Sequence, residues 1–250
     1  MKLQTLRATA LWTAGGVSLL GAGYLALAAA AWSRYGRIIP APSDESDDLL
    51  DRFMPHYEVV ERHRIGVAAP AAITLQAAKS GNLDESLLIR SIFRARELLL
   101  GARPATTPST AGLLAQMTAI GWRVLAEIPD REVVVGAVTQ PWMPNVVFRG
   151  IPPEEFRAFR EPGYVKIVWN LRADPRVDVG SGLSPNPHLK VSETLSVFRT
   201  ETRVITTDDE ARSKFRWYWA RFSPGITLIR RAMLPAVKRD AEALAQAAVC

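Results

Sequence analysis

The sequence predicts an α+β fold in which an antiparallel sheet packs on a long C-terminal helix, preceded by one N-terminal transmembrane helix. Three observations predict it. Residues 8–32 contain no charged side chain, and several later segments alternate apolar and charged residues as strands do. The end of the chain repeats apolar residues at helical spacing.

The charge-free run at 8–32 is long enough to cross a bilayer. As a helix it would rise about 37 Å, against a hydrocarbon core of roughly 30 Å. Four basic residues bracket it, Lys2, Arg7, Arg34 and Arg37. The alternative is a cleaved secretory signal, with Ala28–Ala31 as the cleavage site and a secreted product. The run exceeds the usual signal core, which favours a single-pass membrane protein. The α-amino group adds a positive charge to the N-terminal side of the run, which favours a main domain outside the cytoplasm.

Residues 38–54 join prolines to acidic residues and are interpreted as a linker. The remainder, about 55–245, suits one domain. The formal charge of the chain is +6, but beyond residue 37 it carries 27 Lys and Arg against 25 Asp and Glu. This balance argues against a nucleic-acid partner. We expect a group of basic residues to form an ordinary solvated surface, with contact to anionic lipid headgroups as the alternative. They are Arg157, Arg160, Arg230, Arg231, Lys238 and Arg239.

No catalytic or metal motif is visible. Cys250 is the single cysteine, so no internal disulfide or CxxC site exists. The three histidines show no ligand spacing, and nucleotide-binding and GxSxG motifs are missing from the sequence. We therefore predict no catalytic residue, no metal and no cofactor.

The first half of the domain begins with a strand at 57–68, followed by a helix that Pro70 opens and that runs to about Lys79. A second helix is expected at 84–100, and a loop at 102–112.

Strand patterns then follow in series. A hairpin joins 121–128 to 131–138 through Pro129-Asp130, and 146–148 is a short candidate strand. Two longer strands are expected at 164–173 and 195–206, with a projecting loop at 174–194 between them.

A helix begins at Asp208 and Asp209, is interrupted at 223–225, and resumes near Ile226 with a kink at Pro235. The side chains expected to face it are Val165, Ile167, Trp169, Leu171, Phe198, Thr200, Thr202 and Val204. The other face is expected to be exposed, with Arg199, Glu201 and Arg203 as a solvated ladder.

This order of elements resembles the SRPBCC superfamily, which groups START-like lipid-transfer domains, birch-pollen-allergen-like proteins and polyketide cyclases. The resemblance rests on YEVVERHRIGVAAPAAI, EPGYVKIVWNLRADP and SVFRTETRVITTDDEARSKFRWYW. It implies a helix-grip fold, a curved sheet wrapped around the C-terminal helix, with an apolar cavity between them. The transmembrane segment and the long 174–194 loop depart from the family pattern.

The resemblance makes four residues candidates for the cavity lining, Trp169, Phe198, Thr200 and Trp142. Trp142-Met143-Pro144 is also a candidate apolar loop for contact with lipid. Glu61 and His63 share a face of the first strand and would suit general acid–base work if that face lines the cavity. The simpler interpretation is a polar pair at a strand end.

Three functions follow. The first is a membrane-tethered module that binds a hydrophobic small molecule or lipid, with the bilayer and that ligand as partners. The second is an enzyme of the cyclase or dehydratase type. The third is a protein-interaction module with an unknown protein partner, using the 174–194 loop or the Trp142 loop.

Overall fold

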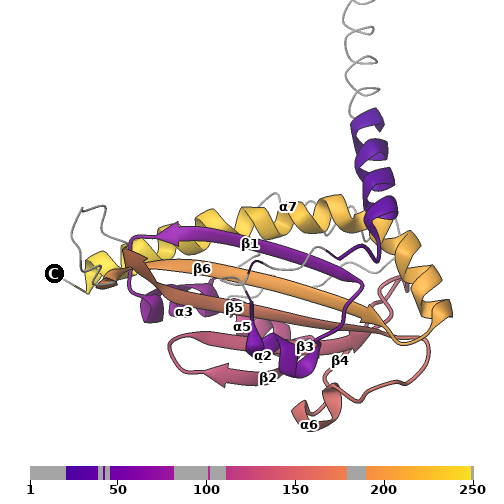
Figure 1. The fold of residues 1–250 in the computed structure, drawn as a ribbon, viewed down its shortest axis with the longest axis horizontal. Coiled ribbons are helices and arrows are strands. Elements are labelled where there is room, and N and C mark those ends of the chain that lie inside the picture. The colour runs from indigo at the N-terminus through magenta and orange to yellow at the C-terminus, as the bar shows by residue number, and fades with distance from the viewer. Residues whose placement is uncertain are drawn as a thin grey trace, which may run out of the picture.

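A computed structural model describes residues 21–38, 42, 46–81, 101, 111–178 and 190–248. In this part of the chain, six antiparallel strands form one sheet in the order β1-β6-β5-β3-β2, with β4 beside β3 (Figure 1). The strands are β1 (Val59–Val67), β2 (Arg123–Ile128), β3 (Glu132–Thr139), β4 (Phe148–Arg149), β5 (Val165–Asp178) and β6 (Lys190–Thr206). The helices are α2 (Asp48–Phe53), α3 (Ala71–Ser80), α5 (Leu113–Ala119), α6 (Pro153–Phe156) and α7 (Asp209–Ala247).

The predicted α+β class is confirmed, and an antiparallel sheet with a long C-terminal helix fits the helix-grip fold. Helix α7 begins as expected, because the Asp208 carboxylate accepts a hydrogen bond from the Ala211 amide. The expected interruption at 223–225 is wrong, since α7 runs through Pro224 and Pro235 as one helix of 39 residues. Each proline removes one backbone hydrogen bond, and the helix changes direction in its first half (Figure 1).

The predicted strand register is confirmed. Alternate residues of β1, β5 and β6 pack on α7, as Val165 and Val204 do against Phe215 and as Trp169 does in the cluster that holds Met233. We call this side of the sheet the inner face. Helix α3 also covers part of it, through Leu75, Ala77 and Ala78.

The opposite side, the outer face, was expected to be exposed, but part of it is covered. Helix α2 lies across it (Figure 1), and its Leu50 and Phe53 pack with Val134, Val168 and other residues. The second half of the expected linker 38–54 is therefore part of the domain. Helix α2 is difficult to predict from the sequence, because it is short and lies in an acidic segment. Only three of its six residues are buried, which is too few for a clear helical periodicity.

The expected loop at 174–194 is strand at both of its described ends, 174–178 and 190–194. Strand β5 continues to Asp178 and β6 starts at Lys190, with Val177 paired to Val191. Residues 179–189, like the helix expected at 84–100, lie outside the described residues.

The expected span at 8–32 is described only in its second part. Residues 21–34 are helical, whereas 8–20 lie outside the described residues. Among the described helices, none is both long and apolar enough to cross a membrane.

Candidate functional site

The inner face carries two hydrophobic clusters. One surrounds the early part of α7 and contains Val59, Val165, Val204, Phe215 and Trp219. The other surrounds the later part, with members that include Val67, Trp169, Phe198, Met233 and Val237. Ile167 packs against both. The apolar core beneath α7 is thus divided into two parts.

Polar side chains lie where the two clusters meet. We call them the polar junction: Glu61, His63, Thr202 and Arg230. On β1, Glu61 and His63 fall between Val59 of the first cluster and Val67 of the second. Strand pairing places Thr202 opposite both Glu61 and Trp169, so these three side chains form a row across the inner face. Glu61, Thr202 and Arg230 are half-buried, which leaves the row partly open to solvent.

Arg230 is held against an aromatic ring. Its guanidinium carbon lies 3.8 Å from the centre of the Trp169 ring, a cation–π contact. The Trp169 indole N–H donates to Thr200 Oγ1 at 2.5 Å, and that hydroxyl donates to the Asn170 carbonyl at 2.8 Å. Burial lowers the pKa of Arg230 to about 10, while the nearby Glu61 carboxylate acts in the opposite direction. The cation is therefore placed on a fixed surface beside an apolar core.

Glu61 and His63 form a pair on the same face. Oε2 of Glu61 lies 3.3 Å from Nε2 of His63, and the two side chains are 23% and 9% exposed. The two groups are close enough for an ion pair, but among the described residues Nε2 of His63 has no hydrogen-bond partner. The structure thus brings the sequence candidates for acid–base work beside Arg230 and Trp169.

The other predicted lining residues are divided between the two clusters. Trp169, Phe198 and Thr200 are buried near the polar junction. Trp142 packs on the first cluster instead, and the neighbouring Met143 is 46% exposed. Arg230 was expected on a solvated surface or at lipid headgroups, but the structure stacks it on Trp169. It lies four residues after Ile226 and three before Met233, on an otherwise apolar helical stripe. A charged residue on an apolar helical stripe is the sequence signal that could have identified Arg230 as a site residue.

Two hollows are found among the described residues, and the smaller one has His63 and Thr200 in its lining. One of about 780 Å³ lies between α3, α5 and β2, lined by Ile73, Leu114 and Val124 among others. Its lining includes Ser80 and Gly112, and most of the sequence between these two residues is outside the described residues. The other, of about 150 Å³, lies where four arginines meet, Arg62, Arg64, Arg172 and Arg199.

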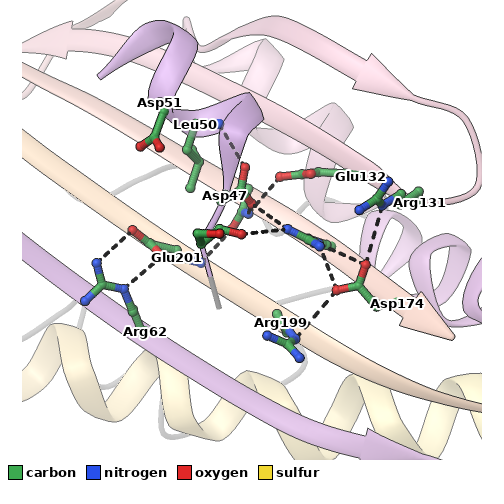
Figure 2. Close-up of polar contacts among 12 residues, drawn as sticks. Asp47, Leu50, Asp51, Arg62, Arg131, Glu132, Asp174, Arg199 and Glu201 are labelled. Atoms are coloured by element: carbon green, nitrogen blue, oxygen red, sulfur yellow. Dashed lines mark hydrogen bonds and ion pairs between the residues drawn. The ribbon is translucent and has the colours of Figure 1, made fainter. Parts of the chain in front are cut away.

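The small hollow belongs to a polar network that fastens α2 to the outer face (Figure 2). We call the network the outer clasp: Asp47, Asp51, Arg62, Glu132, Asn170, Arg172, Asp174, Glu201 and Arg203. Asn170 Nδ2 donates to Asp47 Oδ2 at 2.7 Å and to Glu132 Oε1 at 2.8 Å. Its Oδ1 accepts from the Glu201 amide at 2.6 Å. One buried amide thus ties the residue before α2 to β3 and β6.

The expected solvated ladder is wrong for two of its members. Glu201 and Arg203 are 6% and 3% exposed. Arg203 Nε lies 2.6 Å from Glu201 Oε1, and its Nη1 lies 2.5 Å from Asp51 Oδ1 and 2.9 Å from the Met54 carbonyl. Helix α2 covers this face, so the ladder became a buried ion-pair network.

Burial raises the pKa of Glu132 to about 8, with a further contribution from the adjacent Asp47 carboxylate. The fold therefore favours the protonated form of Glu132. Around the small hollow, Arg62 pairs with Glu201, and Arg172 pairs with Asp47 and Asp174. Arg199 lies 3.6 Å from Asp174 Oδ2, so at least three of the four arginines pair with carboxylates of the chain itself. We therefore interpret the outer clasp as structural. Within the described residues, no three His, Cys, Asp or Glu side chains could hold a metal ion together.

Comparisons with known proteins add little. No family model matches the chain, and no curated protein does. A solved structure, the crystal structure of Zhui aromatase/cyclase from Streptomyces sp. R1128, matches at 12% sequence identity and a TM-score of 0.23. The match covers 74% of this chain and 93% of that one. A likeness at this TM-score carries no argument about function.

Proposed function

We propose that the protein binds an apolar small molecule with an acidic or carbonyl group at the polar junction, and that residues 8–32 hold it at a membrane. The observation that carries the proposal is the placement of Arg230. Its cation stacks on Trp169, between two apolar clusters and beside Glu61 and His63. An apolar ligand would lie along the clusters while its polar group meets the guanidinium.

Helix α7 offers a way for the ligand to enter. The segment opposite the polar junction is flanked by Pro224 and Pro235, and Gly225 adds a weak position. Because each proline leaves a carbonyl one turn earlier without its helical donor, these are the places where the helix bends most easily. Movement of this segment would widen the junction without unfolding the sheet.

Substitution of two neighbouring arginines, Arg230 and Arg231, tests the proposal. We expect the full chain in amphipol to bind a fluorescent fatty acid more tightly than the matching fatty alcohol. Arg230→Gln should weaken binding of the acid about tenfold or more, since a charge-assisted hydrogen bond contributes roughly 1.5–3 kcal/mol. Fluorescence titration measures both affinities.

The matched control is Arg231→Gln, which removes an exposed neighbouring charge. It should leave both affinities unchanged, and Arg230→Gln should leave that of the alcohol unchanged. Equal loss for the acid in both variants, or no binding of either probe to the wild type, would contradict the proposal.

The Glu61–His63 pair favours a second candidate function, an enzyme of the dehydratase or cyclase type. One group would remove a proton from carbon next to a carbonyl that Arg230 polarises, while the other protonates the departing hydroxyl. Molecules extracted from the purified protein supply the test. If an extracted molecule carries a hydroxyl group near a carbonyl, the wild-type protein should convert it with loss of water, and mass spectrometry measures the rate. Glu61→Gln should slow this conversion about 100-fold. Equal rates would exclude this function and leave binding intact.

A further inference from the structure

The helix at 21–34 presents an apolar surface that the domain does not cover. Residues 21–27 are exposed throughout, with Leu25 and Leu27 at 70% and 57% and Tyr24 at 43%. The helix stands away from the domain beside the first part of α7 (Figure 1). In the sequence it continues the charge-free run that starts at residue 8. Contiguous apolar surface of this kind requires a partner.

The end of this helix is fixed to α7. The Trp32 and Trp217 ring centroids are 4.8 Å apart, and the Arg216 guanidinium lies 4.1 Å from the centre of the Trp32 ring. Arg216 also donates to the Trp32 carbonyl, and the Tyr24 hydroxyl donates to the Arg221 carbonyl. The helix is therefore joined to the domain by direct packing, and not by a long flexible linker.

Tyr35 continues this attachment. Its ring packs with Phe215, and its hydroxyl donates to Glu58 Oε2 at 2.6 Å. The Gly36 amide donates to the Glu58 carbonyl at 3.0 Å. With both the helix end and the next turn bonded to the domain, the helix direction sets the orientation of the domain.

The outward side of α7 has the charge that an anionic membrane attracts. Between residues 211 and 239 the chain contains no Asp or Glu. Arg230 faces Trp169 on the inner side, whereas Arg221 and Arg231 are exposed on the outward side. Trp217 (69% exposed), Arg221, Leu228 (45% exposed) and Arg231 are spaced at four, seven and three residues, and so share one face. We call these four residues the outward stripe. Tryptophan and leucine between arginines are typical of a helix at a membrane interface.

We propose that the outward stripe lies on the headgroups of an anionic bilayer, so that the domain is held against the membrane in one orientation. The proposal rests on the membrane attachment proposed above. Trp32 and Trp217 would sit at headgroup level, where tryptophan is enriched, while Arg221 and Arg231 meet lipid phosphates. The bilayer then reaches α7 on the side opposite the polar junction.

Depth-dependent quenching tests this placement. In a Cys250→Ser background, Trp217→Cys or Leu228→Cys is labelled with bimane and the full chain is placed in nanodiscs containing phosphatidylglycerol and doxyl-labelled lipid. Ile128→Cys is the matched control, an exposed apolar residue on β2, at the sheet edge away from β1. We expect quenching at 217 and 228 to exceed that at 128 about twofold or more. Replacing phosphatidylglycerol by phosphatidylcholine, or adding Arg221→Gln and Arg231→Gln, should reduce the difference.

The outcomes separate the two proposals. If the chain remains with the nanodiscs but all three positions are quenched equally, the stripe does not lie on the bilayer and the attachment stands. If a probe at 228 is shielded from both lipid and aqueous quenchers, a protein covers the stripe, which overturns the inference. If the chain does not remain with the nanodiscs, the membrane attachment itself is wrong.

Discussion

Replacing Glu201 by leucine is expected to lower the free energy of unfolding by about 3–5 kcal/mol. The carboxylate lies 2.6 Å from Arg203 Nε and 2.9 Å from Arg62 Nε, and the side chains of Glu201 and Arg203 are 8% and 4% exposed. Without it, Arg203 keeps Asp51 and the Met54 carbonyl as partners but remains largely removed from water. An under-compensated buried charge costs more than the lost ion pair itself. Urea denaturation followed by circular dichroism measures the change.

Two further variants make this result specific. Glu210→Gln removes a 77% exposed carboxylate that pairs with Lys214 one helical turn away, and should cost less than about 0.5 kcal/mol. The double variant Glu201→Leu with Arg203→Met should recover part of the loss, because apolar side chains replace both buried charges. A loss below about 1 kcal/mol for Glu201→Leu would show that the outer clasp is not closed in solution.

The second large effect is on pH dependence. Burial holds the pKa of Glu132 at about 8, against an ordinary value of 4.5 in the unfolded chain. Between these values the folded state retains a proton that the unfolded state releases, so stability falls as pH rises through this window. Glu132→Gln keeps the shape and removes the titration. Its stability relative to wild type should therefore increase from pH 5 to pH 8, by a few kcal/mol.

Thermal unfolding at a series of pH values measures this difference. Glu127→Gln is the control, because Glu127 lies on the adjacent β2 with a side chain 39% exposed and paired with Lys79. Its difference from wild type should be nearly constant with pH. A constant difference for Glu132→Gln as well would mean that the buried carboxyl is already ionised at pH 5.

Much of the fold follows from local patterns that the sequence displays. Alternation at 164–173 and 195–206 predicted β5 and β6, and the charged face of each was placed correctly away from α7. Asp208 predicted the start of α7, and Pro129-Asp130 predicted the β2–β3 hairpin, in which Asp130 takes a positive φ of 60°. These features depend on a few neighbouring residues and on strand parity.

The candidate site was predicted only in part. Glu61 and His63 were identified from the parity of one strand, and Trp169 and Thr200 from two others. Arg230 completes the polar junction from a position far along the chain, where it reads as one of many basic residues. Proximity across such a separation is set by how α7 packs on the sheet, which no short pattern encodes.

By itself the sequence determined the α+β class, the register of the long strands, the apolar stripe of the C-terminal helix and the charge-free N-terminal run, because each is a periodicity or a composition. The tertiary structure alone decided that residues 46–54 cover the outer face, and that Glu201 and Arg203 are buried there. It also decided that Arg230 stacks on Trp169. The physical reason is that the sequence shows a charged side chain in the same way whether water solvates it or another segment of the chain pairs with it. Only the packed chain shows which of the two applies.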